Sequence, residues 1–195
     1  MNWLAHLLLS KGSPAVRIGG ILPDLAKRDE LKDLPNDFQR GIEIHYKIDK
    51  FTDSHKIVKQ SIRHLDVPYQ RFGGILVDMF YDHFLSQEWN YYSSDNLKDF
   101  AHSVYNSIDT YQLILPPSAL KRLKQMREED WLCSYKELEG IRLALKRINS
   151  RMKKPVGLEL GINELESKYD LFHNDFLSFF PELLSFVNQT TKNQH

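Results

Sequence analysis

Apolar residues recur at steps of three and four along most of this chain, which is the spacing of one face of an α-helix. The pattern is clearest in three segments, residues 97–108, 141–152 and 165–179. Pro181 is expected to interrupt the last helix, and the polar residues 188–195 are expected to form a frayed tail. No segment alternates convincingly as a half-buried strand does. The pattern predicts an all-α fold, with one compact multi-helix domain over residues 1–187.

The segment 72–85 combines strong apolar character with acidic residues. Its apolar residues cover nearly the whole circumference of a helix, which predicts a helix that is buried on most sides. Asp78 and Asp82 are four residues apart and share a face, while His83 points about a quarter turn away. Unpaired buried carboxylates are costly, so this pair needs a metal ion or an Arg or Lys from another helix. An internal salt-bridge network is the alternative interpretation.

A second polar line lies on segment 41–65, which is predicted as one helix. His45, Asp49 and Asp53 project from three successive turns toward one point, beside the apolar stripe. Nearby lysines allow the alternative of a solvated face with ion pairs between neighbouring turns. For Asp53 the two interpretations are equally supported. For His45 and Asp49, which are closer to the buried edge, we favour a functional role.

Two weaker signals complete a His/Asp set. His6 interrupts an apolar first helix, although a lone histidine there is more often a satisfied core residue. Asp24 follows a Gly-Gly-Ile-Leu-Pro run and could equally be a helix cap. Together the polar intrusions make the right inventory for a metal centre in an all-helical hydrolase: His6, Asp24, His45, Asp49, Asp78, Asp82 and His83. Imidazole and carboxylate ligands without thiolates suit Mn, Fe, Mg or Zn.

Composition narrows the function classes. The 26 Lys and Arg balance 26 Asp and Glu, so no global basic excess favours nucleic acid as a partner. The single cysteine, Cys133, excludes an internal disulfide framework and a cysteine-rich zinc site. The sequence shows no signal-peptide pattern and no apolar stretch long enough to span a membrane, so we expect a cytoplasmic protein. No phosphate-binding glycine motif is present, and nothing indicates an oligomeric state.

Four segments in register resemble the acyl carrier protein phosphodiesterase family: residues 1–6, 20–25, 41–53 and 77–86. The resemblance implies an all-helical, HD-domain-like fold and a divalent metal, Mn²⁺ first, with Mg²⁺ or Fe²⁺ as alternatives. It implies that the protein hydrolyses the 4'-phosphopantetheine arm from holo acyl carrier protein and leaves the apo form. The metal ligands it implies are Asp24, His45, Asp49, Asp78, Asp82 and His83.

The implied chemistry also assigns catalytic roles. Water activated by the metal would attack the phosphorus atom, and His83 or His6 would protonate the leaving serine oxygen. A nearby cation would stabilise the transition state, the candidates being Lys27, Arg28 and Lys47. The expected catalytic residues are therefore Asp24, Asp78, His83, His6 and Lys47. Three alternatives stay open: hydrolysis of a nucleotide or other small phosphoester, transfer of the arm, and a non-catalytic module that binds a carrier protein.

The neutral balance conceals an uneven distribution of charge. Residues 121–154 hold 11 Lys and Arg against 5 Asp and Glu. A solvated helix face is the ordinary explanation for such a run. A basic surface would also steer an acidic carrier protein, as the family resemblance requires. The docking residues predicted on this basis are Arg142, Lys146, Arg147 and Arg151.

Overall fold

The computed structural model describes residues 1–192 and confirms the all-α prediction over that range. Residues 1–192 form fourteen α-helices and two short 3-10 helices, and no strand is found among them. The helices are α1 (Trp3–Leu9), α2 (Pro14–Gly19), η1 (Leu22–Asp24), α3 (Arg28–Leu31), α4 (Asn36–Ser54), α5 (Lys56–His64), α6 (Val67–Gln70), α7 (Gly73–Gln87), α8 (Trp89–Tyr92), α9 (Leu97–Tyr111), α10 (Pro117–Glu128), α11 (Trp131–Ser134), α12 (Leu138–Asn149), η2 (Leu158–Gly161), α13 (Ile162–Ser167) and α14 (Tyr169–Lys192).

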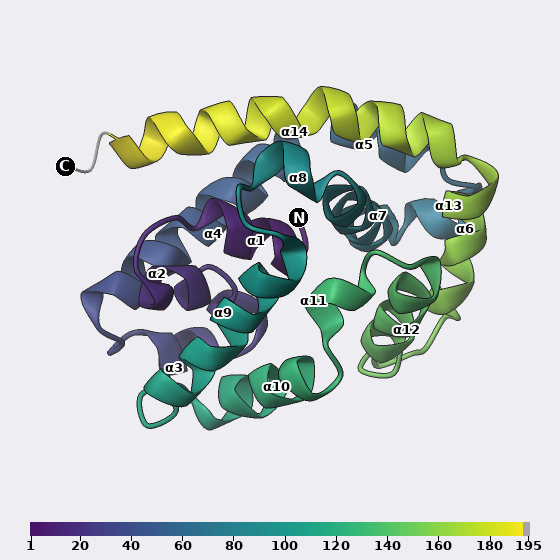
Figure 1. Cartoon of the computed structure of the whole chain (residues 1–195). Helices are drawn as coiled ribbons and strands as arrows, with labels where there is room; N and C mark the ends of the chain where they lie inside the picture. Colours follow the sequence, from purple (N-terminus) through teal and green to yellow (C-terminus); the bar gives the residue numbers. More distant parts are fainter. Residues whose placement is uncertain (193–195) are drawn as a thin grey trace.

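Helix α7 forms the centre of the packing. It contacts α1, α5, α12 and α14, and side chains are buried on most sides of it, as its apolar circumference predicts. Figure 1 shows α14 running along one side of the molecule above α5 and α7, with α10 on the opposite side. Polar side chains on α7 are therefore held inside the protein, where they need partners.

The segment predicted as one helix over residues 41–65 is two helices. Helix α4 ends at Ser54 because His55 adopts an extended backbone, with φ −70° and ψ 136°. The Nδ1 atom of His55 then accepts a hydrogen bond from the backbone N–H of Ile57 and caps α5. Apolar spacing continues through the break, so the pattern by itself does not reveal it.

The C-terminal helix also differs from its prediction. A break at Lys168 separates α13 from α14, and Pro181 lies inside α14 without ending it. Pro181 and Leu177 are both exposed, so water can reach the carbonyl that proline leaves without a donor. Residues 188–192 are therefore helical rather than frayed, while residues 193–195 lie outside the described residues. No described helix, α14 included, is both long and apolar enough to cross a membrane.

Two glycines bring α2 against α4. A Cβ atom on Gly41 would lie 2.7 Å from Cα of Gly19 and would collide with the carbonyl oxygen of Val16. Helix α2 ends at Gly19, with Gly20 as its C-cap, at this close approach. This close approach places the backbone carbonyl of Gly20 beside α4, where it contacts the side chain of His45.

Candidate active site

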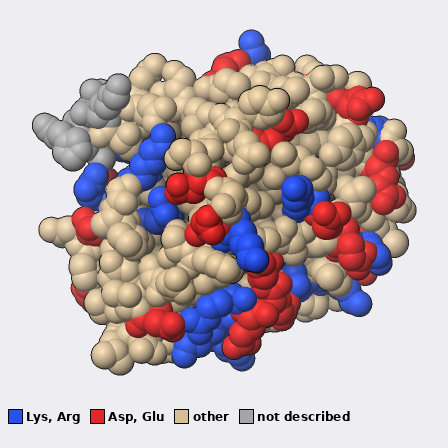
Figure 2. Space-filling model, viewed as in Figure 1, with Lys and Arg blue, Asp and Glu red and all other residues tan. Residues whose placement is uncertain are grey.

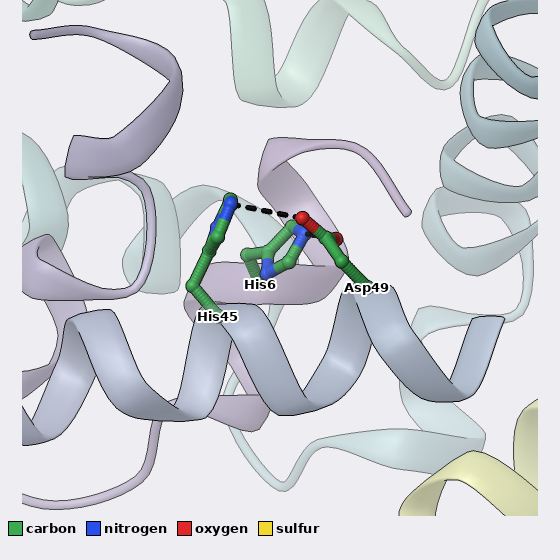
Figure 3. Close-up of side chains that lie close together, drawn as sticks. All are labelled: His6, His45 and Asp49. Atoms are coloured by element: carbon green, nitrogen blue, oxygen red, sulfur yellow. Dashed lines mark ion pairs between the residues drawn. The ribbon is translucent and has the colours of Figure 1, made fainter. Parts of the chain in front are cut away.

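Two imidazoles and one carboxylate converge where α1 meets α4 (Figure 3). His45 and Asp49 lie one turn apart on α4, and His6 reaches them from α1. The Nε2 atom of His45 lies 3.0 Å from Oδ2 of Asp49, and Nε2 of His6 lies 3.1 Å from Oδ1 of the same carboxylate. One ligand atom from each residue lies within 4.8 Å of the others, so the three could hold one metal ion.

The second nitrogen of each imidazole shows how the ring is held. Nδ1 of His45 lies 2.8 Å from the carbonyl oxygen of Gly20, which can only accept, so Nδ1 donates and Nε2 faces the carboxylate. Nε2 of His6 also contacts the carbonyl oxygen of Met1, at 3.0 Å. Nδ1 of His6 is buried and has no hydrogen-bond partner among residues 1–192. Both rings are thus fixed by contacts outside the cluster.

Burial and charge set the protonation states of the cluster. Burial lowers the pKa of His6 to about 4, so this imidazole is neutral at pH 7. Burial also lowers the pKa of His45, but Asp49 and Asp24 outweigh that effect and the net shift is upward. Burial raises the pKa of Asp49, but the two imidazoles outweigh it and hold the carboxyl well below its ordinary range. Asp49 is therefore ionised, as a metal ligand must be.

The acidic pair on α7 is neutralised by the start of α1. Oδ1 of Asp78 lies 3.0 Å from the α-ammonium group of Met1. Asp82 accepts hydrogen bonds from the backbone N–H groups of Leu4, at 2.7 Å, and Ala5, at 3.2 Å. The positive end of α1 supplies what the sequence pattern demanded from a metal ion or a basic side chain. Burial raises the pKa of Asp82 to about 7.

A cleft of about 290 Å³ opens beside the cluster. It gathers acidic side chains from η1, α4 and α7, one arginine from α10, one arginine from the segment after α12, and several apolar side chains. Its lining residues are Met1, Asn2, Trp3, Asp24, Asp49, Asp53, Ile75, Asp78, Met79, Arg122, Ile148 and Arg151. The structure thus brings Asp24, Asp49 and Asp78 to one cleft, and Asp53 joins them.

Asp24 is oriented by two long-range contacts. The indole N–H of Trp3 donates to Oδ2 of Asp24 at 3.0 Å, and Nη1 of Arg122 donates to its backbone oxygen at 3.4 Å. Its Oδ1 atom lies 3.8 Å from Nε2 of His45. Nε2 of His45 therefore has two carboxylates near it, with Asp49 at 3.0 Å and Asp24 farther away.

Five of the predicted catalytic and metal-ligand residues lie outside the cleft lining, and His45, which contacts Asp49 from the same helix, is one of them. Asp82 is fully buried under α1, and both of its oxygens accept backbone hydrogen bonds. His83 lies 2.9 Å from the carbonyl oxygen of Tyr135 and 3.0 Å from the hydroxyl of Tyr169, outside the cleft lining. Lys47 is two residues from both His45 and Asp49, so it faces another side of α4. His6 lies beneath Asp49 rather than at the cleft wall.

The predicted docking residues have separate environments. Arg142 pairs with Glu139, while Arg147 pairs with Glu129 at 2.7 Å and stacks on Trp131. Lys146 is exposed, and Arg151 lines the cleft. On the face in Figure 2, blue and red side chains lie next to each other over α10 and α12. Internal ion pairs thus take up part of the positive charge counted in the sequence.

Arg122 is a cleft residue that the sequence analysis missed. It stands in a basic run with Lys121, Lys124 and Arg127, which hides it by composition. Its spacing was informative, because Arg122 continues the buried stripe of α10 formed by Ala119, Leu123 and Met126. Lys27, one of the expected transition-state cations, lines an adjoining groove with Asp24 and Arg122.

Comparisons with known proteins identify the family of this chain. A model of the family "Acyl carrier protein phosphodiesterase" matches residues 1–183. Acyl carrier protein phosphodiesterases of Escherichia coli strains E24377A and HS are each 27% identical over 186 residues, covering 95% of this chain and 96% of each relative. No solved structure matches the chain, so the HD-domain relationship stays a prediction. Because the family model spans almost the whole chain, this protein belongs to the acyl carrier protein phosphodiesterase family.

Proposed function

We propose that the cleft hydrolyses the phosphodiester bond that joins 4'-phosphopantetheine to a serine of holo acyl carrier protein. The observation that carries this proposal is the convergence of His6, His45 and Asp49 at the edge of a cleft that also presents Asp24 and Asp78. Membership of the phosphodiesterase family and the name of its Escherichia coli relatives supply the substrate class.

The residues present fit a divalent cation. Two imidazoles and an ionised carboxylate offer nitrogen and oxygen donors, and the hydrogen bond from His45 to Gly20 is the kind of outer contact that orients metal-ligating histidines. We infer that His6, His45 and Asp49 hold the cation, with Asp24 as the adjacent carboxylate. Mn²⁺ is our first choice, and Mg²⁺ or Fe²⁺ are the alternatives. When bound, the cation supplies Lewis acidity toward phosphoryl oxygens and lowers the pKa of water.

Asp78 is the residue that we propose to move the proton. It lines the cleft, and burial raises the pKa of its carboxyl more than the neighbouring ammonium group of Met1 lowers it, a net shift in the direction that a general acid needs. In this role Asp78 donates a proton to the leaving serine oxygen. Neither His6 nor His83 suits that task, because both lie outside the cleft lining and burial lowers the pKa of each imidazole.

Mass spectrometry of holo acyl carrier protein incubated with this enzyme and Mn²⁺ tests the proposal. The wild type should remove the mass of phosphopantetheine and leave the apo protein. Asp49→Asn should slow the reaction at least a hundredfold, whereas Asp29→Asn, on the exposed face of α3, should not change it. Cleavage of nucleotides but not holo carrier protein would move the function to small phosphoesters. Binding without any metal-dependent cleavage would leave a non-catalytic module.

A further inference from the structure

Two arginines from separate parts of the chain line the cleft together with its acidic residues. Arg122 comes from the middle of α10, and Arg151 lies two residues after the end of α12. Both line the same cleft as Asp24, Asp49 and Asp78. Neither side chain forms an ion pair within 4.0 Å of an acidic group among the described residues, whereas Arg127, Arg142 and Arg147 each do.

Holding these two guanidinium groups in one cleft has an electrostatic cost. Burial lowers the pKa of Arg151, and the charge of Arg122 lowers it further, while Tyr135 and Asp24 act in the opposite direction. Arg122 donates from Nη1 to the backbone oxygen of Asp24 and not to its carboxylate. The other N–H groups of the guanidinium do not take part in that hydrogen bond. A pair of like charges in a shared cleft is stabilised when an anion lies between them.

We propose that Arg122 and Arg151 form a clamp for the non-bridging oxygens of the phosphodiester, in the cleft that Asp49 of the His6, His45 and Asp49 cluster also lines. Arginine suits this task because its planar fork can bind two phosphoryl oxygens at once. In this proposal the two arginines, and not Lys27, Arg28 or Lys47, supply the positive charge that stabilises the transition state. The identification of the clamp as a phosphodiester subsite rests on the proposed function. The affinity of the clamp for a tetrahedral anion is independent of that function.

The cleft also gives this anion an apolar neighbour. Trp3, Met79 and Ile148 line both the cleft and a smaller adjoining cavity, and Arg151 lies at both. A phosphoryl group held by the clamp therefore places one of its substituents against an apolar wall. That arrangement suits an organic diester such as a phosphopantetheine arm better than free phosphate.

Sulfate, a soluble tetrahedral dianion, tests the clamp directly. Isothermal titration of sulfate into the Mn²⁺-loaded protein should show binding that weakens about tenfold or more in Arg122→Ala and in Arg151→Ala. Arg127→Ala is the matched control on α10, because Arg127 pairs with Asp109 outside the cleft, and it should bind sulfate as the wild type does. Arg122→Lys and Arg151→Lys keep the charge but lose the fork, so each should lose less than its alanine variant.

Kinetics with holo carrier protein separate the clamp from the proposed function. Each alanine variant should raise the KM and lower kcat, while its thermal unfolding midpoint stays near that of the wild type. Sulfate affinity that is unchanged in both alanine variants, or absent in the wild type, would overturn the clamp even if the enzyme cleaves holo carrier protein. Arginine-dependent sulfate binding in a protein that releases no phosphopantetheine would uphold the clamp and reject the proposed substrate.

Discussion

His6, His45 and His83 are all buried, but their imidazole rings contact different groups. His6 and His45 share one carboxylate, while His83, on α7, contacts the backbone carbonyl of Tyr135 and the hydroxyl of Tyr169. The sequence presents all three as polar intrusions in apolar segments. What separates the metal-ligand candidates from a structural histidine is the identity of the groups that meet each ring.

We expect His83 to make stability depend on pH. Burial lowers its pKa from 6.5, so below that value the unfolded chain takes up a proton that the folded state resists. Its contribution to stability is present above about pH 6.5 and declines as the pH falls. His83→Gln should therefore lose less stability than the wild type between pH 7 and pH 5, in urea unfolding at each pH. His102→Gln, at an exposed position on α9, should keep the wild-type dependence; equal curves for both variants would contradict the assignment.

Short contacts between helices position the site at the scale of single elements. Helix α1 has seven residues and carries His6, and its first N–H groups are held by Asp82 from α7. Helices α2 and α4 approach through Gly19 and Gly41, which places the carbonyl of Gly20 against His45. Each proposed ligand thus depends on a pair of helices and not only on its own helix.

Removing the carboxylate that caps α1 should destabilise the protein. Asp82→Ala leaves the buried N–H groups of Leu4 and Ala5 without their acceptor. We expect a loss of about 3 kcal/mol in the free energy of unfolding, measured by urea denaturation at pH 8, where Asp82 is mainly ionised. Asp33→Ala, at an exposed position, is the control and should change stability by less than about 0.5 kcal/mol. A loss as small as that control would show that the capping bonds matter little.

Separating α2 from α4 should disturb both stability and the site. The Cβ of Gly41→Ala meets the backbone of Val16 and Gly19, which cannot move as a flexible side chain would. Overpacking of this kind should cost about 3 kcal/mol in urea unfolding. Metal affinity should fall too, because the shift carries the Gly20 carbonyl away from His45. Gly74→Ala has open space around its Cβ, and it should leave both quantities unchanged or slightly raise stability.

At the scale of the whole molecule, the cleft is assembled from distant parts of the chain. Its polar lining extends in sequence from Asn2 to Arg151, and α7 contributes Ile75, Asp78 and Met79 to the cleft. A cation held by α1 and α4 would tie these elements together. Binding to the folded state alone therefore stabilises the entire domain.

Mn²⁺ should raise the thermal unfolding midpoint of the wild type. At a metal concentration of one hundred times Kd, the stabilisation is about 2.7 kcal/mol. For a chain of this size we expect a midpoint shift of about 5–10 °C in a thermal scan, reversed by a chelator. Asp49→Asn should lose most of the metal-dependent shift, whatever its midpoint without metal, whereas Asp29→Asn should keep it. An identical shift in both variants would place the metal elsewhere.

The sequence by itself determined much of this protein. Helical spacing specified the all-α class and the buried circumference of α7, because side-chain periodicity is a local property. The spacing of His45 and Asp49 placed both on one face of a single helix, where they are found. The segments that resemble the family predicted the membership that the comparison confirms.

Only the tertiary structure decided which polar residues meet. Asp78 and Asp82 share a helix face, yet one faces the cleft and the other caps α1, because the position of a neighbouring helix settles where each carboxylate finds a partner. Arg122 and Arg151 are 29 positions apart in sequence and line one cleft. Local spacing carries no information on such encounters, since they depend on how helices pack, and packing is set by side chains along the entire chain.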